Sequence, residues 1–301
     1  MAPPEAPSVP HGPWRSLRRV LVLTLALIGL PGVGPIREVQ AQPVGSWPGS
    51  TWGELRFPAS EQPEDDDNLL LQGRLEQNVV LLDLGASLKL LGFADLDYKA
   101  DTTGYVYNNK LKLGVGGKLR FLPVEGGVID VGALYQSDYQ LKTHDSFNGP
   151  MYFVDWLGLW SLAASDLAED SEWRPLGYPG LIWGEVRYPS SHDPTERHDL
   201  LAEGAVEQGI DWVRVGPGKV FNTFASLEYT VDTEKLDYNN SVTVGAGAKL
   251  KIDLRGHGLL QIGVQYVWDR RWISASDRDG FLAFVNWSGW WSLPIRVAEG
   301  P

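Results

Sequence analysis

An internal repeat limits the possible folds of this chain more than any other feature. The segment WGELRFP at 52–58 returns as WGEVRYP at 183–189, and YNNKLKLGVGGKLR at 107–120 returns as YNNSVTVGAGAKLK at 238–251. Both pairs share one offset (183 − 52 = 131 and 238 − 107 = 131) without a gap. A unit of this length is not a short solenoid repeat. We therefore predict two copies of one module, with repeat one at 48–162, a linker at 163–178 and repeat two at 179–293.

The first 41 residues have the pattern of a secretory signal peptide. Arg15, Arg18 and Arg19 precede the apolar run VLVLTLALIGL, and the small residue Ala41 follows at the usual cleavage spacing. The apolar run is short for a membrane-spanning helix, although an uncleaved anchor is the alternative. We expect residues 1–41 to direct export and residues 42–301 to form the mature protein, a β-barrel.

Composition excludes several classes of function. The chain has no cysteine, so it has neither disulfides nor a thiolate site. Its formal net charge is −12, and the first 41 residues contribute +2 from four arginines and two glutamates, so the remainder carries −12 − 2 = −14. Such acidity argues against nucleic acid as a partner.

Each copy contains six stretches with the alternation of β-strands. In 110–122, Leu111, Leu113 and Val115 alternate with Lys110 and Lys112, which places apolar and charged side chains on opposite faces of a sheet. No stretch has a convincing helical period. In the first copy the six stretches lie near 51–57, 69–82, 87–98, 110–122, 127–139 and 151–162.

The connections between these stretches alternate in length. Long polar segments follow the first, third and fifth stretches, including 99–109 and 140–150, whereas 123–126 is short. Alternating long loops and tight turns are typical of outer-membrane barrels. We therefore predict an all-β fold, a transmembrane antiparallel barrel of about twelve strands. The alternative is a soluble periplasmic protein with two six-stranded β domains.

Barrel closure makes a further demand, because an unpaired strand edge facing lipid would lose its hydrogen bonds. Stretch 151–162 should therefore pair with 182–188, and 281–293 with 51–57. Strand 51–57 is short for a membrane crossing. If it does not span, each copy contributes five strands rather than six.

Aromatic residues gather toward the ends of the stretches, as in the interfacial girdles of membrane barrels. The candidates are Tyr135, Trp156, Trp160, Trp268, Trp287 and Trp291. With the signal peptide and the alternation, they resemble Gram-negative outer-membrane β-barrels. The phrases AEGAVEQGIDW at 202–212 and SLEYTVDTEKLDYNN at 226–240 resemble the carboxy-terminal barrels of exopolysaccharide-export and phage-adsorption outer-membrane proteins. Those proteins carry helical repeats ahead of the barrel and end on an aromatic residue, whereas here SLPIRVAEGP follows Trp291.

Charged residues that recur in both copies are the candidates for the lumen wall. They are Glu54, Arg56, Glu76, Lys118 and Arg120 in the first copy and Glu185, Arg187, Glu207, Lys249 and Lys251 in the second. A mixed lining of this kind sets a transverse field in a pore, or forms ion pairs that plug a closed barrel. We expect outer-membrane lipid as a partner and passage or export of a polar solute, such as a saccharide. The alternative is a closed barrel that serves as a surface anchor, an adhesin or a phage-binding platform.

Signals for catalysis and for metal binding are weak. None of the four histidines of the mature chain (His144, His192, His198 and His257) recurs in the other copy, and no G-x-S-x-G motif surrounds a serine. The acidic run at 64–67 lacks the spacing of a calcium loop. We therefore expect no enzymatic step, no cofactor and no metal. The sequence does not indicate an oligomeric state.

Overall fold

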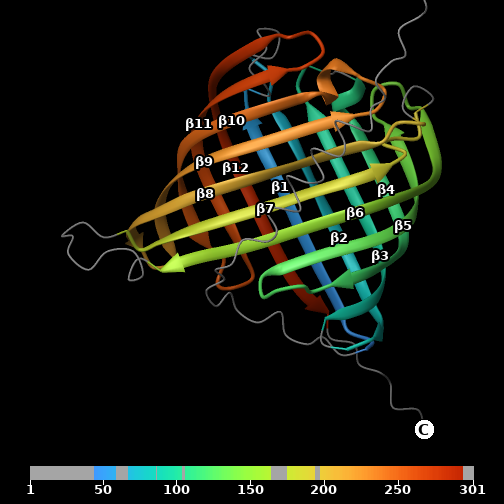
Figure 1. The fold of residues 1–301 in the computed structure, drawn as a ribbon, viewed down its shortest axis with the longest axis horizontal. Coiled ribbons are helices and arrows are strands. Elements are labelled where there is room, and N and C mark those ends of the chain that lie inside the picture. Colours follow the sequence, from blue (N-terminus) through green and yellow to red (C-terminus); the bar gives the residue numbers. More distant parts are fainter. Residues whose placement is uncertain are drawn as a thin grey trace, which may run out of the picture. The chain divides into compact units, whose positions relative to one another are not determined.

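The computed structural model describes residues 44–58, 67–85, 87–103, 106–163, 175–193 and 197–293. Twelve strands in these ranges form one closed antiparallel barrel, in which every strand pairs with its neighbours in sequence and β1 pairs with β12. Figure 1 shows β6, β7 and β8 crossing β1, β2 and β3 at a steep angle, as opposite walls of a barrel with tilted strands do. The predicted fold, a closed all-β barrel of twelve strands, is confirmed.

The strand bounds complete this description. The first six strands are β1 (Trp47–Phe57), β2 (Leu70–Asp83), β3 (Leu88–Asp101), β4 (Lys110–Phe121), β5 (Gly127–Gln140) and β6 (Ser146–Ala163). The other six are β7 (Gly177–Tyr188), β8 (Leu201–Gly216), β9 (Lys219–Asp232), β10 (Ser241–Asp253), β11 (Gly258–Arg271) and β12 (Asp277–Leu293). Short 3-10 turns, η2 (Val106–Asn108) and η4 (Asp237–Asn239), precede β4 and β10.

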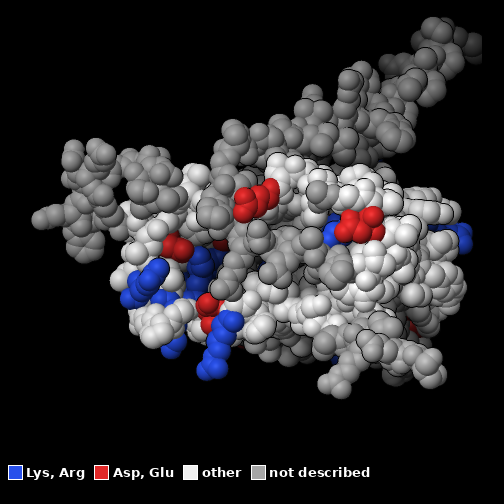
Figure 2. Space-filling model, turned by 90° about the horizontal axis from the view of Figure 1, so that it is seen from below, with Lys and Arg blue, Asp and Glu red and all other residues white. Residues whose placement is uncertain are grey.

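Alternation decides which side chains enter the barrel. In β4, Lys112 and Lys118 are buried in the interior, whereas Leu113 and Val115 are exposed on the outer wall. This polarity is the reverse of a soluble barrel, which buries its apolar face. Figure 2 shows the result on one face, where uncharged side chains cover most of the described wall. No helix within the described residues is long and apolar enough to cross a membrane.

The closing seam lies where the sequence predicts it. Gly53 of β1 pairs with Trp287 of β12, and Trp183 of β7 pairs with Leu157 of β6. β1 has 11 residues because it begins at Trp47, ahead of the predicted start. Pro48 and Gly49 obscure this start, because both residues are poor strand formers. The barrel therefore has twelve strands rather than ten.

Two of the predicted long loops are shorter in the structure. The connection from β3 to β4 covers 102–109, and that from β5 to β6 covers only 141–145. The latter is compact because the Gln140 N–H donates to the carbonyl of Asp145 at 2.9 Å, and His144 turns the chain with a φ of 62°. Strand pairing thus continues into residues that the polar composition assigned to a loop.

The two sequence copies form strands with equivalent bounds. β3 (Leu88–Asp101) and β9 (Lys219–Asp232) are offset by 131 residues at both ends (219 − 88 and 232 − 101), and so are β5 and β11. The connection between the halves lies between Ala163 of β6 and Gly177 of β7. We propose on this basis that β1–β6 and β7–β12 are two copies of one unit. The predicted signal peptide, 1–41, lies outside the described residues.

Candidate functional site in the barrel lumen

An ion pair crosses the interior of the barrel. The Arg74 guanidinium of β2 lies 3.3 Å from the Glu185 carboxylate of β7, and 3.9 Å from the Asp155 carboxylate of β6. It also donates to Asp97 of the adjacent strand β3 at 3.1 Å. Because β2 and β7 are five strands apart in the ring, the contact can form only through the lumen. The opposite walls therefore meet at this level.

A second charged network lies beside it in the first half. Lys118 Nζ is 2.7 Å from Glu76 and 2.9 Å from Asp130, and its side chain is 1% exposed. The Arg120 guanidinium forms a bidentate pair with the same Asp130 carboxylate, with hydrogen bonds of 2.8 and 2.7 Å. A buried ammonium group is tolerated only when it is paired in this way. The network therefore fixes side chains inside the lumen rather than leaving them free to line a wide pore.

An apolar layer fills the space next to these charges. Phe93, Leu134, Met151 and Phe153 form a buried cluster, and the two phenylalanine rings meet edge to face at 5.7 Å. Lys118 Nζ lies 4.8 Å above the Phe93 ring, a cation–π contact. The cavity that remains between this cluster and the Arg74 network measures about 10 Å³. This is room for about one water molecule.

The second half carries an equivalent layer. Phe224 and Phe284 meet edge to face at 5.9 Å, and Lys249 Nζ lies 4.3 Å above the Phe224 ring. Lys249 pairs with Glu207 at 2.6 Å, and Lys251 with Asp211 at 3.0 Å. The same arrangement of a phenylalanine pair, a lysine and a glutamate thus occupies the lumen twice.

The ten sequence candidates for the lumen wall lie on the inward-facing side of their strands. Six of them belong to the networks above, and Glu185 accepts the cross-lumen contact. The other three form pairs within one strand: Arg56 with Glu54 at 2.8 Å, and Arg187 with Glu185 at 3.2 Å. Their role in passage stays a proposal.

Sequence reasoning missed Arg74, Asp97, Asp130 and Asp155. It selected charges that recur in both copies, whereas the equivalents of Arg74, Asp130 and Asp155 are the neutral residues Ala205, Gln261 and Asn286. Asp97 recurs as the carboxylate Glu228 and was passed over. Strand parity gave a usable signal, because Arg74 stands two positions before the candidate Glu76 on the same strand. The contact between β2 and β7 depends on barrel diameter, which the sequence pattern does not give.

The six candidate interface aromatics lie on the outward-facing side. The Trp291 indole donates to Gln77 at 2.9 Å, and the Trp160 indole donates to Gln208 at 3.0 Å. The Tyr135 hydroxyl donates to Asn148 at 2.6 Å. Trp156, Trp268 and Trp287 occupy outward positions of β6, β11 and β12. Rings that present an apolar body and a bonded polar tip suit a membrane interface, which remains a proposal.

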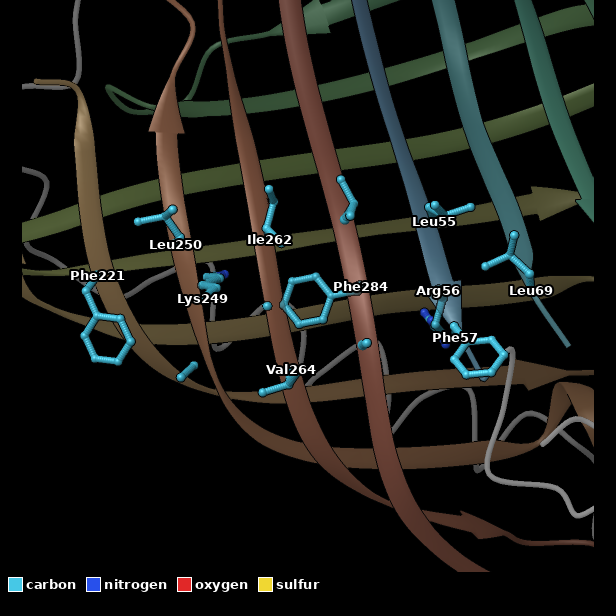
Figure 3. A pocket seen from close by; sticks show the side chains of 14 residues that line it. Leu55, Arg56, Phe57, Leu69, Phe221, Lys249, Leu250, Ile262, Val264 and Phe284 are labelled. Carbon is cyan, nitrogen blue, oxygen red and sulfur yellow. The ribbon is translucent and has the colours of Figure 1, made fainter. Parts of the chain in front are cut away.

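A shallow hollow lies on the outer wall across β1, β10, β11 and β12. Figure 3 shows Leu250, Ile262 and Leu55 along it, while Lys249 turns away from it into the barrel. Its volume is about 550 Å³, and small residues such as Ala248 and Ala283 leave the space open. The hollow is therefore separate from the lumen.

Residues 191–193, which follow β7, fold over the loop end of the barrel. The Ser191 hydroxyl and the His192 N–H both donate to the Asp138 carboxylate of β5, at 3.1 and 3.3 Å. The Gln140 amide donates to Asp193 at 3.0 Å. Burial lowers the pKa of the His192 imidazole, while the nearby Asp138 carboxylate acts in the opposite direction. This segment therefore covers part of the mouth above the first half.

Within the described ranges, no three histidine, aspartate or glutamate residues are placed to hold a metal ion. Most of the acidic run, 64–66, lies outside those ranges. His144 contacts the Tyr139 hydroxyl at 2.8 Å, and neither His144 nor His192 has a serine hydroxyl among its observed hydrogen-bond partners. The absence of an enzymatic step and of a cofactor stays a prediction.

Comparisons with known proteins give fold similarity alone. No family model matches the chain, and no curated protein matches it. An outer membrane channel from Pseudomonas putida F1 is 12% identical over 85% of this chain and 100% of its own, with a TM-score of 0.39. The beta domain of the Bordetella autotransporter BrkA is 12% identical over 82% and 99%, with a TM-score of 0.38. LpxR from Salmonella typhimurium is 11% identical over 80% and 99%, with a TM-score of 0.35. TM-scores this low carry no argument about function.

Proposed function

We propose that this chain is an outer-membrane barrel of a Gram-negative bacterium whose lumen is closed at rest, and that it acts as a surface platform through its loops. Membrane insertion is supported by the outer wall, where Leu113, Val115 and Phe281 are exposed around a charged interior. A barrel of this polarity is stable only when lipid covers the wall.

The single observation that carries the closed lumen is the Arg74–Glu185 pair. It joins strands five places apart in the ring, so a solute at that level would have to displace it. The two phenylalanine–lysine layers add a second obstruction. A protein that does not pass solute freely keeps its exposed loops for function, because loops tolerate substitution and present contacts. Attachment of a surface partner, such as a phage or another cell, fits this arrangement.

The test is a leak assay on purified protein in liposomes. Vesicles loaded with a small sugar should retain it in the presence of wild-type protein. The double variant Phe93→Gly with Phe153→Gly, which empties the apolar layer, should release it. Rapid release by the wild type would overturn the closed lumen. A matched pair on the outer wall, Leu113→Gly with Val115→Gly, controls for damage to the bilayer.

A second candidate is gated passage of a polar solute such as a saccharide, on the side of the lumen formed by β7–β12 and β1. On the inward-facing side Trp52 remains 47% exposed and Trp183 38% exposed, and Glu203 and Glu207 are also reached by solvent. Aromatic faces with flanking polar groups suit sugars. The proposal predicts that sugar release by the wild type appears only after a trigger, such as a membrane voltage. If the vesicles retain the sugar under every trigger, gated passage is excluded and the surface platform is the function that remains.

A further inference from the structure

A row of short side chains forms the floor of the hollow on the outer wall. Ala248 of β10 pairs with Val264 of β11, and Val264 pairs with Ala283 of β12. Paired residues point to the same face of a sheet, so these three side chains stand next to one another on the outside. Because they are short, they leave a volume of about 550 Å³ above the strands.

Longer apolar side chains bound this floor. The next outward row, two positions along each strand, contains Leu250, Ile262 and Val285, which pair in that order. Phe221 of β9 and Phe57 of β1 line the hollow as well, and they are 38% and 46% exposed. Figure 3 shows these two rings at opposite ends of the hollow. The hollow is therefore an open trough with aromatic ends.

The side chains that face the trough from outside are apolar. Arg56 and Lys249 border it, but their charged groups point into the barrel, where they pair with Glu54 and Glu207. Among the described residues that line the trough, no polar side chain is left on the outside to bind a headgroup. The chemistry of the lining therefore fits a hydrocarbon.

The length of the trough matches that of one acyl chain. From β9 to β1 it crosses four steps between neighbouring strands, and four steps of about 4.8 Å give about 19 Å. An acyl chain within one leaflet spans about 15 Å, which is half of a hydrocarbon core of about 30 Å. The volume of about 550 Å³ also lies within the range of pockets that hold small molecules.

A second barrel fits this trough less well than a lipid chain does. Phe281 precedes Ala283 by two positions on the same face of β12 and is 73% exposed, and its ring meets that of Tyr266 edge to face at 5.0 Å. A rigid, convex neighbouring wall would contact Phe281 and Phe57 before it reached the floor, whereas a flexible chain can pass between them. In a bilayer, packing contacts of this kind decide which apolar group a surface holds.

The first half has a ring at the equivalent of Ala283. The residue 131 positions earlier (283 − 131 = 152) is Tyr152, which is 58% exposed. It pairs with Ala133, the equivalent of Val264, so it stands in the same row of the outer wall. A phenol in one half thus corresponds to a methyl group in the other.

We propose that the trough is a binding site for one acyl chain of a membrane lipid, which lies across β9–β12 and β1. The bound chain supplies the van der Waals contacts that the short side chains of the floor cannot make. Tyr152 takes the place of such a chain in the first half. The proposal rests on membrane insertion, which is part of the proposed function, but it does not depend on a closed lumen.

The experiment is photocrosslinking of the full chain in vesicles of phosphatidylethanolamine and phosphatidylglycerol that contain a phospholipid with a diazirine in its acyl chain. Flotation of the vesicles first confirms insertion. The protein is then extracted in detergent and purified before illumination, so that loosely held lipid is removed. Mass spectrometry of fragments locates the crosslinks. In the wild type, labelling should remain at 262–264 and 283–285, with little at the equivalents 131–133 and 152–154.

Reciprocal substitutions test the role of the ring. Ala283→Tyr gives the second half the side chain of the first, and it should lower the retained labelling at 262–264 to the level of 131–133. Tyr152→Ala should raise the labelling at 131–133. Leu113→Ala, on the outer wall of β4 outside both rows, is the matched control and should change neither.

Three outcomes would overturn the proposal. Equal labelling of the two halves after extraction, or unchanged labelling in Ala283→Tyr, would mean that the trough holds no chain of its own. A wild-type dimer in detergent that Ala283→Tyr converts to a monomer would mean that a second copy fills the trough. A chain that does not float with the vesicles would contradict membrane insertion itself, and the acyl site with it. Tyr152→Ala keeps the proposal testable if Ala283→Tyr does not fold.

Discussion

The two halves of the barrel contain the same closing layer but different charges around it. Both have the phenylalanine pair, with ring centroids 5.7 and 5.9 Å apart, and a lysine paired with a glutamate. Five charged residues of the first half correspond to mostly neutral ones in the second. Arg74, Asp95, Asp97, Asp130 and Asp155 are matched by Ala205, Ser226, Glu228, Gln261 and Asn286.

The difference in charge between the halves distinguishes the aromatic side chains, which close the lumen, from the ion pairs, which stabilise the closed state. The aromatic layer is present twice, so it is the common means of filling the interior. The cross-lumen pair depends on Arg74, and the equivalent position in the second half is Ala205, which has no charge to extend. The side chains inside the first half are therefore held by more ion pairs than those inside the second half. We expect an opening of the lumen to begin on the side of the second half.

The largest expected effect tests the shared layer. Phe153→Ala and Phe284→Ala should each lower the free energy of unfolding by about 3–5 kcal/mol, the usual cost of emptying a buried aromatic site. The two values should agree within about 1 kcal/mol, because the sites are equivalent. Urea unfolding in detergent, followed by tryptophan fluorescence, measures both. A strong effect in only one half would break the equivalence.

The next prediction contrasts the two buried lysines. Glu207→Gln should cost about 3 kcal/mol, because Lys249 has a single carboxylate partner among the described residues and would be left buried and unpaired. Glu76→Gln should cost less, since Lys118 keeps Asp130 at 2.9 Å. The same unfolding measurement compares them. A larger loss of unfolding free energy from Glu76→Gln than from Glu207→Gln would contradict this, because it would mean that Asp130 does not compensate Lys118.

A third prediction concerns pH at the mouth of the first half. Burial lowers the pKa of His192 in the folded state, so the unfolded state binds the proton more readily. The imidazole therefore favours the docked segment above the unfolded pKa of about 6.5, and this contribution is lost as the pH falls below it. Limited proteolysis within 189–193 should accelerate a few-fold between pH 7.5 and pH 5.5. His192→Asn should flatten that dependence, whereas unchanged acceleration would assign it elsewhere.

How far the sequence predicts this molecule depends on the kind of contact. Alternation in 110–122 gives the inward and outward faces of β4, and the repeat gives the pairing of 281–293 with 51–57, because both rest on neighbouring strands. The 141–145 turn was predicted too long, since its polar residues continue the strand pairing. The Arg74–Glu185 contact was not predictable, because it depends on how the barrel closes in three dimensions.

The smallest expected effect comes from moving one charge between the halves. Gln261→Asp places a carboxylate at the equivalent of Asp130, where it can serve as a second partner for Lys249. We expect a gain of at most about 1 kcal/mol, because the cost of burying the new anion offsets most of the attraction. Asn286→Asp, at the equivalent of Asp155, is the control and should not stabilise the barrel. A gain from the control alone would contradict the pairing.

The most direct test of the closed lumen is current recording from the purified wild-type protein in a planar lipid bilayer at neutral pH and low voltage. The closed interior predicts a flat baseline in the wild type. Discrete current steps should appear in the variant Phe93→Gly with Phe153→Gly. Steady, discrete conductance in the wild type, unchanged by that substitution, would mean that ions pass the level of Arg74 and Glu185 freely, and it would contradict the closed lumen.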